Sequence, residues 1–217
     1  MTESARTLLD AVREDLKAAE AGNRLVPLVS EAKAPRSAFG LIAAEETRIV
    51  PSDWRAFLTL AARSQEPAAR QFFSAMADGE RLSLAKLPAL AAAGGLDEKA
   101  VREYQPMAGC QGYPSYVAWL ALNAEPADVI VALCANFAAF GEYCGALAGA
   151  MRDRYGLDSE ATGFFDFFAA PAPELEALAE SAVQAAADSG QLTGEAPLYA
   201  RLFQEFELMF WNTVADA

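Results

Sequence analysis

Close to the C-terminus the chain reads Phe-Gln-Glu-Phe-Glu-Leu-Met-Phe-Trp over residues 203–211. On a helix with 3.6 residues per turn, Phe203, Glu207 and Phe210 fall on one stripe. Glu205 points the other way, where a solvated acid belongs. The pattern therefore predicts a helix that buries Glu207 among aromatic side chains.

Two interpretations of Glu207 follow from this position. A carboxyl group in apolar surroundings has a raised pKa and can act as a general acid or base at the floor of a pocket. Alternatively, the carboxylate is satisfied by a neighbouring arginine, tyrosine or backbone amide. Buried charges are rare unless they are paired or used, and paired structural ones also have perturbed pKa values. The spacing alone leaves both interpretations open.

Helical periodicity dominates the rest of the chain, and no segment shows convincing strand alternation. The predicted helices cover residues 3–21, 35–48, 53–64, a stretch from 67 that Gly79 and Pro88 interrupt and Gly94 ends, and residues 98–104, 113–123, 126–154, 164–168, 173–190 and 196–214. Residues 23–34 and 105–112 are predicted connections, and Pro51 a helix break. The expected architecture is one all-α domain over residues 1–217 with about eight to ten helices.

Composition excludes several partners. The formal net charge is −13, from 30 acidic and 17 basic residues. Phosphate binding needs concentrated Lys and Arg, so we expect no nucleic acid and no anionic membrane as partner. The longest apolar run, 129–141, is shorter than the roughly 20 residues of a spanning helix.

The chain has no histidine and three cysteines. The lack of histidine excludes a proximal-His haem, His-bearing metal sites and Ser-His or Cys-His triads. Cys110, Cys134 and Cys144 lack paired metal-type spacing, so we expect no metal and no cofactor. An odd cysteine number without a recognisable signal sequence predicts a cytoplasmic protein.

The predicted central helix, residues 126–154, carries further candidates. Cys134 is either a nucleophile or a small buried hydrophobe, and no histidine is present to generate its thiolate. Asn136 either binds a ligand or bonds across helices. Gly141, Gly145 and Gly149 share one face, which indicates close packing of a second helix or of a flat molecule.

Aromatic residues elsewhere have two interpretations each, and an acidic pair has one. Tyr113 and Tyr116 either contact a ligand or belong to the core. The cluster 164–168, with Phe164 and Phe168, forms either core or one wall of an apolar pocket for a planar molecule. The consecutive acids Glu45 and Glu46 are normally a solvated face.

In their order, these motifs resemble the TenA / thiaminase II family, which has the helical haem-oxygenase-like fold. An acidic pair at 45–46 is followed by Tyr113, a Cys-containing central helix, an aromatic-Asp-aromatic segment at 164–168 and the terminal motif 206–212. The resemblance covers roughly residues 5–215. A weaker similarity, over 48–55, is to the pyrroloquinoline-quinone synthase group, whose pocket histidines are missing here.

The resemblance implies a role for several residues. Glu207 matches the family's acid/base, Tyr113 a pocket tyrosine, and Glu46 the acid that holds a pyrimidine amine. The family's nucleophilic cysteine falls at Cys134 or Leu133: aligning Gly141 and Phe137 with the family pattern puts Leu133 in that slot.

Hydroxyl groups of the family pattern are lost at Ile49 and in the segment 164–168, so specificity should move away from aminopyrimidines. The resemblance thus implies a homo-oligomer (dimer or tetramer) that binds a small heteroaromatic compound. Either it hydrolyses a thiamine-related aminopyrimidine or another C–N bond, or it is a non-catalytic binding or regulatory protein of the same fold.

Overall fold

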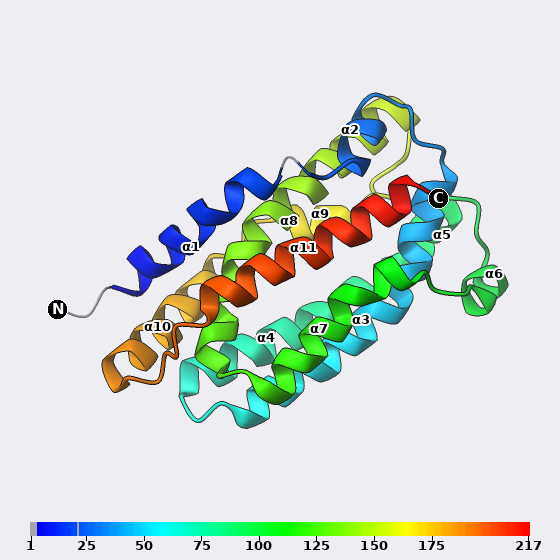
Figure 1. The fold of residues 1–217 in the computed structure, drawn as a ribbon. Helices are drawn as coiled ribbons and strands as arrows, with labels where there is room; N and C mark the ends of the chain where they lie inside the picture. Colours follow the sequence, from blue (N-terminus) through cyan, green and yellow to red (C-terminus); the bar gives the residue numbers. More distant parts are fainter. Residues whose placement is uncertain (1–3, 21) are drawn as a thin grey trace.

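The computed structural model describes residues 4–20 and 22–217, and all the regular elements in this part of the chain are helices (Figure 1). They are α1 (Ala5–Glu20), α2 (Leu25–Ser30), α3 (Ser37–Arg63), α4 (Pro67–Leu84), α5 (Leu87–Ala93), α6 (Glu98–Glu103), α7 (Ala108–Asn123), α8 (Pro126–Tyr155), α9 (Gly163–Ala169), α10 (Pro173–Ser189) and α11 (Ala196–Ala215). The predicted all-α class is confirmed. Residues 3 and 21, the predicted ends of the first helix, lie outside the described residues.

The longer helices form a closed ring. In order round the ring, α3 packs on α4, α4 on α10, α10 on α8, α8 on α11, α11 on α7, and α7 on α3. Figure 1 shows α3, α4 and α7 on one side of the bundle and α1, α8 and α11 on the other. The short helix α9 packs on α8 and α5. This ring encloses the space in which the candidate site lies.

Helix α8 is the buried central helix that the sequence predicts. Every residue from Pro126 to Asn136 is buried. By length and composition alone α8 could cross a membrane, but most of its apolar stretch is buried inside the bundle. The core helix of a soluble protein has the same character.

Two hydrophobic cores lie toward opposite ends of the helical bundle. One surrounds Phe72 and Phe203, and the other surrounds Phe39 and Trp211. Helices α3, α8 and α11 each pass from one core to the other. Where they do so, they bury polar side chains: Glu46, Asp53, Asn136, Gln204 and Glu207. A buried polar layer between two apolar cores is the region where a ligand site is expected.

The predicted helix break at Pro51 is wrong, because α3 continues through this proline. A proline inside a helix removes one backbone hydrogen bond and strains the preceding turn. Here the residues on both sides are held by packing: Ile49 and Val50 contribute to one core, and Phe57 to the other. Tertiary burial therefore outweighs the local preference.

The predicted connections are also shorter than expected. Residues 23–34 contain α2, and α7 begins at Ala108 inside the predicted loop 105–112. The glycines that suggested a loop are sites where α7 approaches α11. A Cβ atom on Gly109 would lie 2.1 Å from Thr213 Oγ1, and one on Gly112 would lie 2.9 Å from Phe206 Cδ1. Glycine is needed there for close helix packing.

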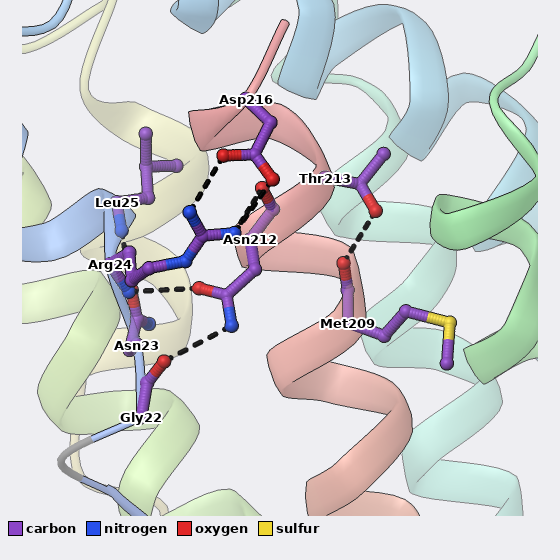
Figure 2. Close-up of polar contacts among 8 residues, drawn as sticks. All are labelled: Gly22, Asn23, Arg24, Leu25, Met209, Asn212, Thr213 and Asp216. Carbon is purple, nitrogen blue, oxygen red and sulfur yellow. Dashed lines mark hydrogen bonds and ion pairs between the residues drawn. The ribbon is translucent and has the colours of Figure 1, made fainter.

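The end of α11 is tied to the segment that enters α2 (Figure 2). The Arg24 guanidinium donates to both carboxylate oxygens of Asp216, each at 2.7 Å. The Asn212 side chain accepts from Arg24 N at 2.9 Å and donates to Gly22 O at 3.1 Å. Asn212, part of the predicted C-terminal motif, thus anchors α11 rather than facing the bundle interior.

Candidate functional site

A cavity of about 1370 Å³ lies inside the ring and is open to solvent. Its lining comes from α1, α3, α4, α7, α8, α9, α10 and α11. Exposed residues that also line it mark the entrance: Leu82 on α4, Glu142 on α8 and Pro171 between α9 and α10. A ligand can therefore reach the buried polar layer from outside.

Glu207 lies at the cavity wall on α11, and the predicted stripe is confirmed. Phe203, Glu207 and Phe210 are buried, with Glu207 only 3% exposed. Glu205 is exposed and pairs with Arg201 at 2.8 Å. The placement therefore follows from helical periodicity.

Two neutral donors hold the Glu207 carboxylate. Trp211 Nε1 donates to its Oε1 at 2.9 Å, and the Asn136 side-chain amide donates to its Oε2. Asn136 thus bonds across from α8 to α11, as one of its two interpretations predicted. Hydrogen bonds of this kind fix the orientation of a carboxylate and favour its charged form.

Three more buried carboxyl groups line the cavity from the other side. Glu46 and Asp53 belong to α3, and Glu80 belongs to α4. Burial raises the pKa of Glu46 and of Asp53 well above the ordinary range, and the charges of neighbouring carboxylates raise both further. Burial also raises the pKa of Glu80 to about 8.

Asp53 differs from Glu207 in its partners. Its side chain is 4% exposed, and its buried Oδ1 has no hydrogen-bond partner within the described chain. A buried oxygen without a partner is unusual in a folded protein and indicates a missing ligand group or a strained site.

Asp53 and Glu80 are not among the site residues predicted from the sequence. In the sequence, Asp53 is the first residue of the helix predicted over 53–64, after the predicted break at Pro51. For Glu80 a signal existed, because Phe72, Met76 and Glu80 recur every four residues on one face of α4. That is the same acid-on-an-apolar-stripe pattern that drew attention to Glu207.

Tyr113 is close to Glu207 and to the three acids of α3 and α4. Burial raises the pKa of its phenol well above the ordinary value, and the charges of Asp53, Glu207, Glu80 and Glu46 raise it further. The phenol therefore stays protonated and can donate a hydrogen bond into the cavity.

Tyr116, one turn further along α7, is not among the residues that line the cavity. Its ring packs on Phe203 and Phe206 at 5.3 Å and on Trp119 at 6.1 Å between ring centroids. It therefore belongs to the core, which was the second interpretation of this residue.

The expected aromatic residues Phe137, Phe164 and Phe168 do line the cavity. The ring of Phe168 makes edge contacts with Phe164 at 5.1 Å and with Phe140 at 5.2 Å. Further lining rings are Phe57, Phe72, Phe167 and Phe210. The walls are thus suited to a planar or apolar body.

On α8 it is Cys134, and not Leu133, that borders the cavity; Leu133 is fully buried in the core. Burial raises the pKa of the Cys134 thiol to about 12, although the nearby Arg13 lowers it. The thiol is therefore protonated at neutral pH.

The glycine face of α8 continues from Cys134 along the cavity and meets the end of α9. A Cβ atom on Gly141 would lie 3.4 Å from Phe168 O, and one on Gly145 would lie 3.7 Å from Ala169 Cβ. A Cβ atom on Gly149 has no such neighbour within 4 Å. These are ordinary contact distances, so neither glycine is required for packing on α9, and Gly141 and Gly145 also line the cavity.

The predicted solvated face at Glu45 and Glu46 is wrong, because both side chains are buried. Glu45 is fully buried and accepts three hydrogen bonds of 2.7 Å, from the Tyr104 hydroxyl, the Met107 backbone N–H and the Gln111 side-chain amide. These donors come from a segment far away in sequence, so helix periodicity could not reveal them. Glu45 fixes the start of α7 against α3.

For metal binding, the described part of the chain contains no group of three or more His, Cys, Asp or Glu side chains arranged to hold an ion.

The ring of helices around this cavity has the architecture of a haem-oxygenase-like helical bundle. Solved structures with this fold match nearly the whole chain. A TenA homologue from Pseudomonas syringae pv. tomato has a TM-score of 0.75 and 10% identity, over 96% of this chain and 92% of that one.

Two other solved structures agree with this assignment. A protein from a Silicibacter species, described as a TenA family transcription regulator, has a TM-score of 0.70 and 14% identity over 100% of this chain and 98% of its own. A Shewanella denitrificans domain of unknown function, described as having a heme oxygenase-like fold, has a TM-score of 0.72 and 13% identity, over 100% and 92%. At these identities the likeness establishes the fold.

No protein-family model matches the sequence, and no curated protein matches it in sequence.

Proposed function

We propose that this protein is a divergent TenA-like hydrolase. It binds a small heteroaromatic compound in the cavity and cleaves a C–N bond with Glu207 as general acid and base. One observation carries the proposal: the buried Glu207 carboxylate, held by Trp211 and Asn136, borders an aromatic-walled cavity that is open to solvent. A fixed carboxylate next to a binding cavity is the arrangement that proton transfer needs.

In the proposed reaction, water attacks the carbon atom that carries the nitrogen. The Glu207 carboxylate takes a proton from the water as the C–O bond forms, and it passes this proton to the nitrogen as the C–N bond breaks. The products are the hydroxylated ring compound and a free amine or ammonia. Tyr113 would donate a hydrogen bond to the bound ring, and Glu46 would accept one.

This reaction does not use Cys134 as a nucleophile. Nucleophilic cysteines react as thiolates, and the pKa of about 12 keeps this thiol protonated. The same observation favours a second candidate function, a non-catalytic binding protein in which the cavity is kept and the covalent chemistry is lost. The apolar Ile49 and Phe168 on the cavity wall support an altered ligand in either case.

Turnover assays distinguish the two functions. Purified protein is incubated with thiamine, aminopyrimidine degradation products of thiamine and other heteroaromatic amines, and products are followed by mass spectrometry. Glu207→Gln should lower kcat by about 10²–10⁴-fold. Glu205→Gln, an exposed acid on the same helix, should leave it unchanged. If the panel binds and none of its members is hydrolysed by the unaltered protein, the binding function replaces the enzymatic one.

The expected homo-oligomer, the expected lack of nucleic-acid and membrane partners, and the cytoplasmic location stay predictions from the sequence and the family resemblance. Light scattering, gel-shift and vesicle-binding measurements would test the first three.

A further inference from the structure

The side chains that line the cavity differ sharply in charge. Among the described residues they include eight carboxyl groups and one guanidinium group, that of Arg13. The acids are Glu46, Asp53, Asp78, Glu80, Glu142, Glu174, Glu176 and Glu207. Arg13 lies on α1, where its Nε donates to Cys134 O at 3.2 Å and its Nη1 pairs with Asp10 at 3.9 Å. The lining can therefore carry far more negative than positive charge.

Three of these acids are buried without a compensating cation. Glu46, Asp53 and Glu80 make no salt bridge with any described residue, and Asp53 Oδ1 has no hydrogen-bond partner there. Burial raises the pKa of all three groups, and the charges of neighbouring carboxylates raise the pKa of Glu46 and Asp53 further. Burying carboxylates in this way is unfavourable unless a partner neutralises them.

The surroundings of these acids are aromatic. Phe57 lies one turn beyond Asp53 on α3, Phe72 lies two turns before Glu80 on α4, and both rings line the cavity. Aromatic faces attract cations, and they also bury an apolar body. The described acids lack the arrangement that a metal ion requires. The combination thus fits an organic cation better than an inorganic one.

We propose that the cavity takes an organic ammonium ion, a protonated amine on an aryl or heteroaryl body. Its charged nitrogen binds between Asp53, Glu80 and Glu46, and its ring lies along the phenylalanine walls. This inference deepens the proposed function and rests on it for the ligand's place in the molecule. It assigns to Asp53 and Glu80 the selection of charge, while Glu207 on the opposite wall performs proton transfer.

The test compares matched ligands that differ only in charge. Three sets are measured by titration calorimetry at neutral pH: phenethylamine, phenethyl alcohol and phenylacetate; tryptamine, tryptophol and indoleacetate; pyridylmethylamine, pyridylmethanol and pyridinecarboxylate. In at least one set the amine should bind about tenfold or more tightly than the alcohol, because it makes charge-assisted hydrogen bonds. The carboxylate should bind most weakly.

Two variants locate the effect. Asp53→Asn and Glu80→Gln should each weaken the amine by about tenfold and leave the affinity of the alcohol unchanged. Glu205→Gln, which removes an exposed acid from α11, should change neither affinity. Circular dichroism confirms folding, and both cavity variants should fold because each keeps the size of the side chain and removes a buried ionisable group.

Three results would overturn the inference: no amine of the three sets binds, the alcohol binds as tightly as its amine in every set, or Asp53→Asn leaves amine binding unchanged. Binding of Mn²⁺ that Asp53→Asn abolishes, without amine binding, would also overturn it.

The outcome of this test is distinguishable from that of the test of the proposed function. Amine binding that survives in Glu207→Gln supports the charge site even if no compound is hydrolysed, and turnover of a neutral substrate without amine binding would leave the hydrolase without this charge site.

Discussion

The two walls of the cavity treat their carboxyl groups differently. On the wall formed by α8 and α11, Glu207 is held by Trp211 and Asn136. On the wall formed by α3 and α4, Asp53 has a buried oxygen without a partner in the described chain. The first arrangement fixes a carboxylate in place, and the second leaves a charge to be neutralised by something else. In the proposed function, the first wall transfers protons and the second wall binds the ligand.

The same contrast occurs between neighbours on one helix. Glu45 and Glu46 are adjacent on α3, so their side chains are turned by about 100° from one another. Glu45 accepts three hydrogen bonds, whereas Glu46 lines the cavity and has a pKa raised by burial and by the carboxylates around it. Position around the helix axis therefore decides which acid is structural.

The largest expected effect separates these two neighbours. Glu45→Ala leaves the donors of Tyr104, Met107 and Gln111 without their acceptor, and should lower the free energy of unfolding by about 3 kcal/mol or more. Glu46→Ala removes a buried charge from a cluster of acids and should leave stability unchanged or raise it. Urea denaturation of both variants measures the difference. Equal losses of stability would show that the contrast between the two acids is wrong.

The second prediction concerns the pH dependence of stability. The pKa of Glu80 is raised in the folded protein from 4.5 to about 8, so in this range the folded state holds its proton more tightly than the unfolded chain. Stability from this group is present at low pH and is lost as pH rises through about 8. Asp53 and Glu46 face Glu80 and titrate in the same direction.

Glu80→Gln should therefore reduce the loss of stability that accompanies rising pH. Between about pH 5 and about pH 8, the free energy of unfolding of the unaltered protein should fall by on the order of 2 kcal/mol more than that of the variant. Thermal melts across this pH range measure the difference. Glu205→Gln serves as the exposed control and should retain the decline. Parallel curves for Glu80→Gln and the unaltered protein would mean that the acids of this wall are neutralised within the folded chain.

A smaller effect tests how firmly the other wall holds its acid. Trp211→Phe keeps the aromatic volume but removes the Nε1–H that donates to Glu207. The free energy of unfolding should fall by about 1–2 kcal/mol, because a buried carboxylate loses a donor. If a substrate is found, kcat should fall more than KM rises, since the change acts on the orientation of Glu207. Phe210→Leu, a core change beside it, should lower stability without this kinetic split.

How far the sequence predicted the site depends on how many helices are needed to build each part. Glu207 was found because its environment is readable from α11 alone, where an acid lies on an aromatic stripe. The all-α class and the buried central helix followed from periodicity in the same way. Each of these predictions uses only local spacing along one helix.

What the sequence missed depends on contacts between helices. Asp53 and Glu80 converge only because α3 and α4 pack side by side, and the proline before Asp53 suggested a break that packing on both sides prevents. Glu45 finds its donors on a segment far along the chain. The glycines at the start of α7 suggested a loop, whereas they allow close contact with α11.

The smallest expected effect concerns Cys134, which borders the cavity on α8. If Glu207 performs the chemistry without a covalent step, Cys134→Ser should change kcat by less than about threefold. A thiol with a pKa of about 12 supplies almost no thiolate at neutral pH. Iodoacetamide should label the unaltered protein slowly at neutral pH, as judged by intact mass. Glu207→Gln in the same assay provides the comparison. A loss of turnover in Cys134→Ser as large as that in Glu207→Gln would instead assign a covalent step to the thiol. The wall formed by α8 and α11 would then contain a second catalytic residue.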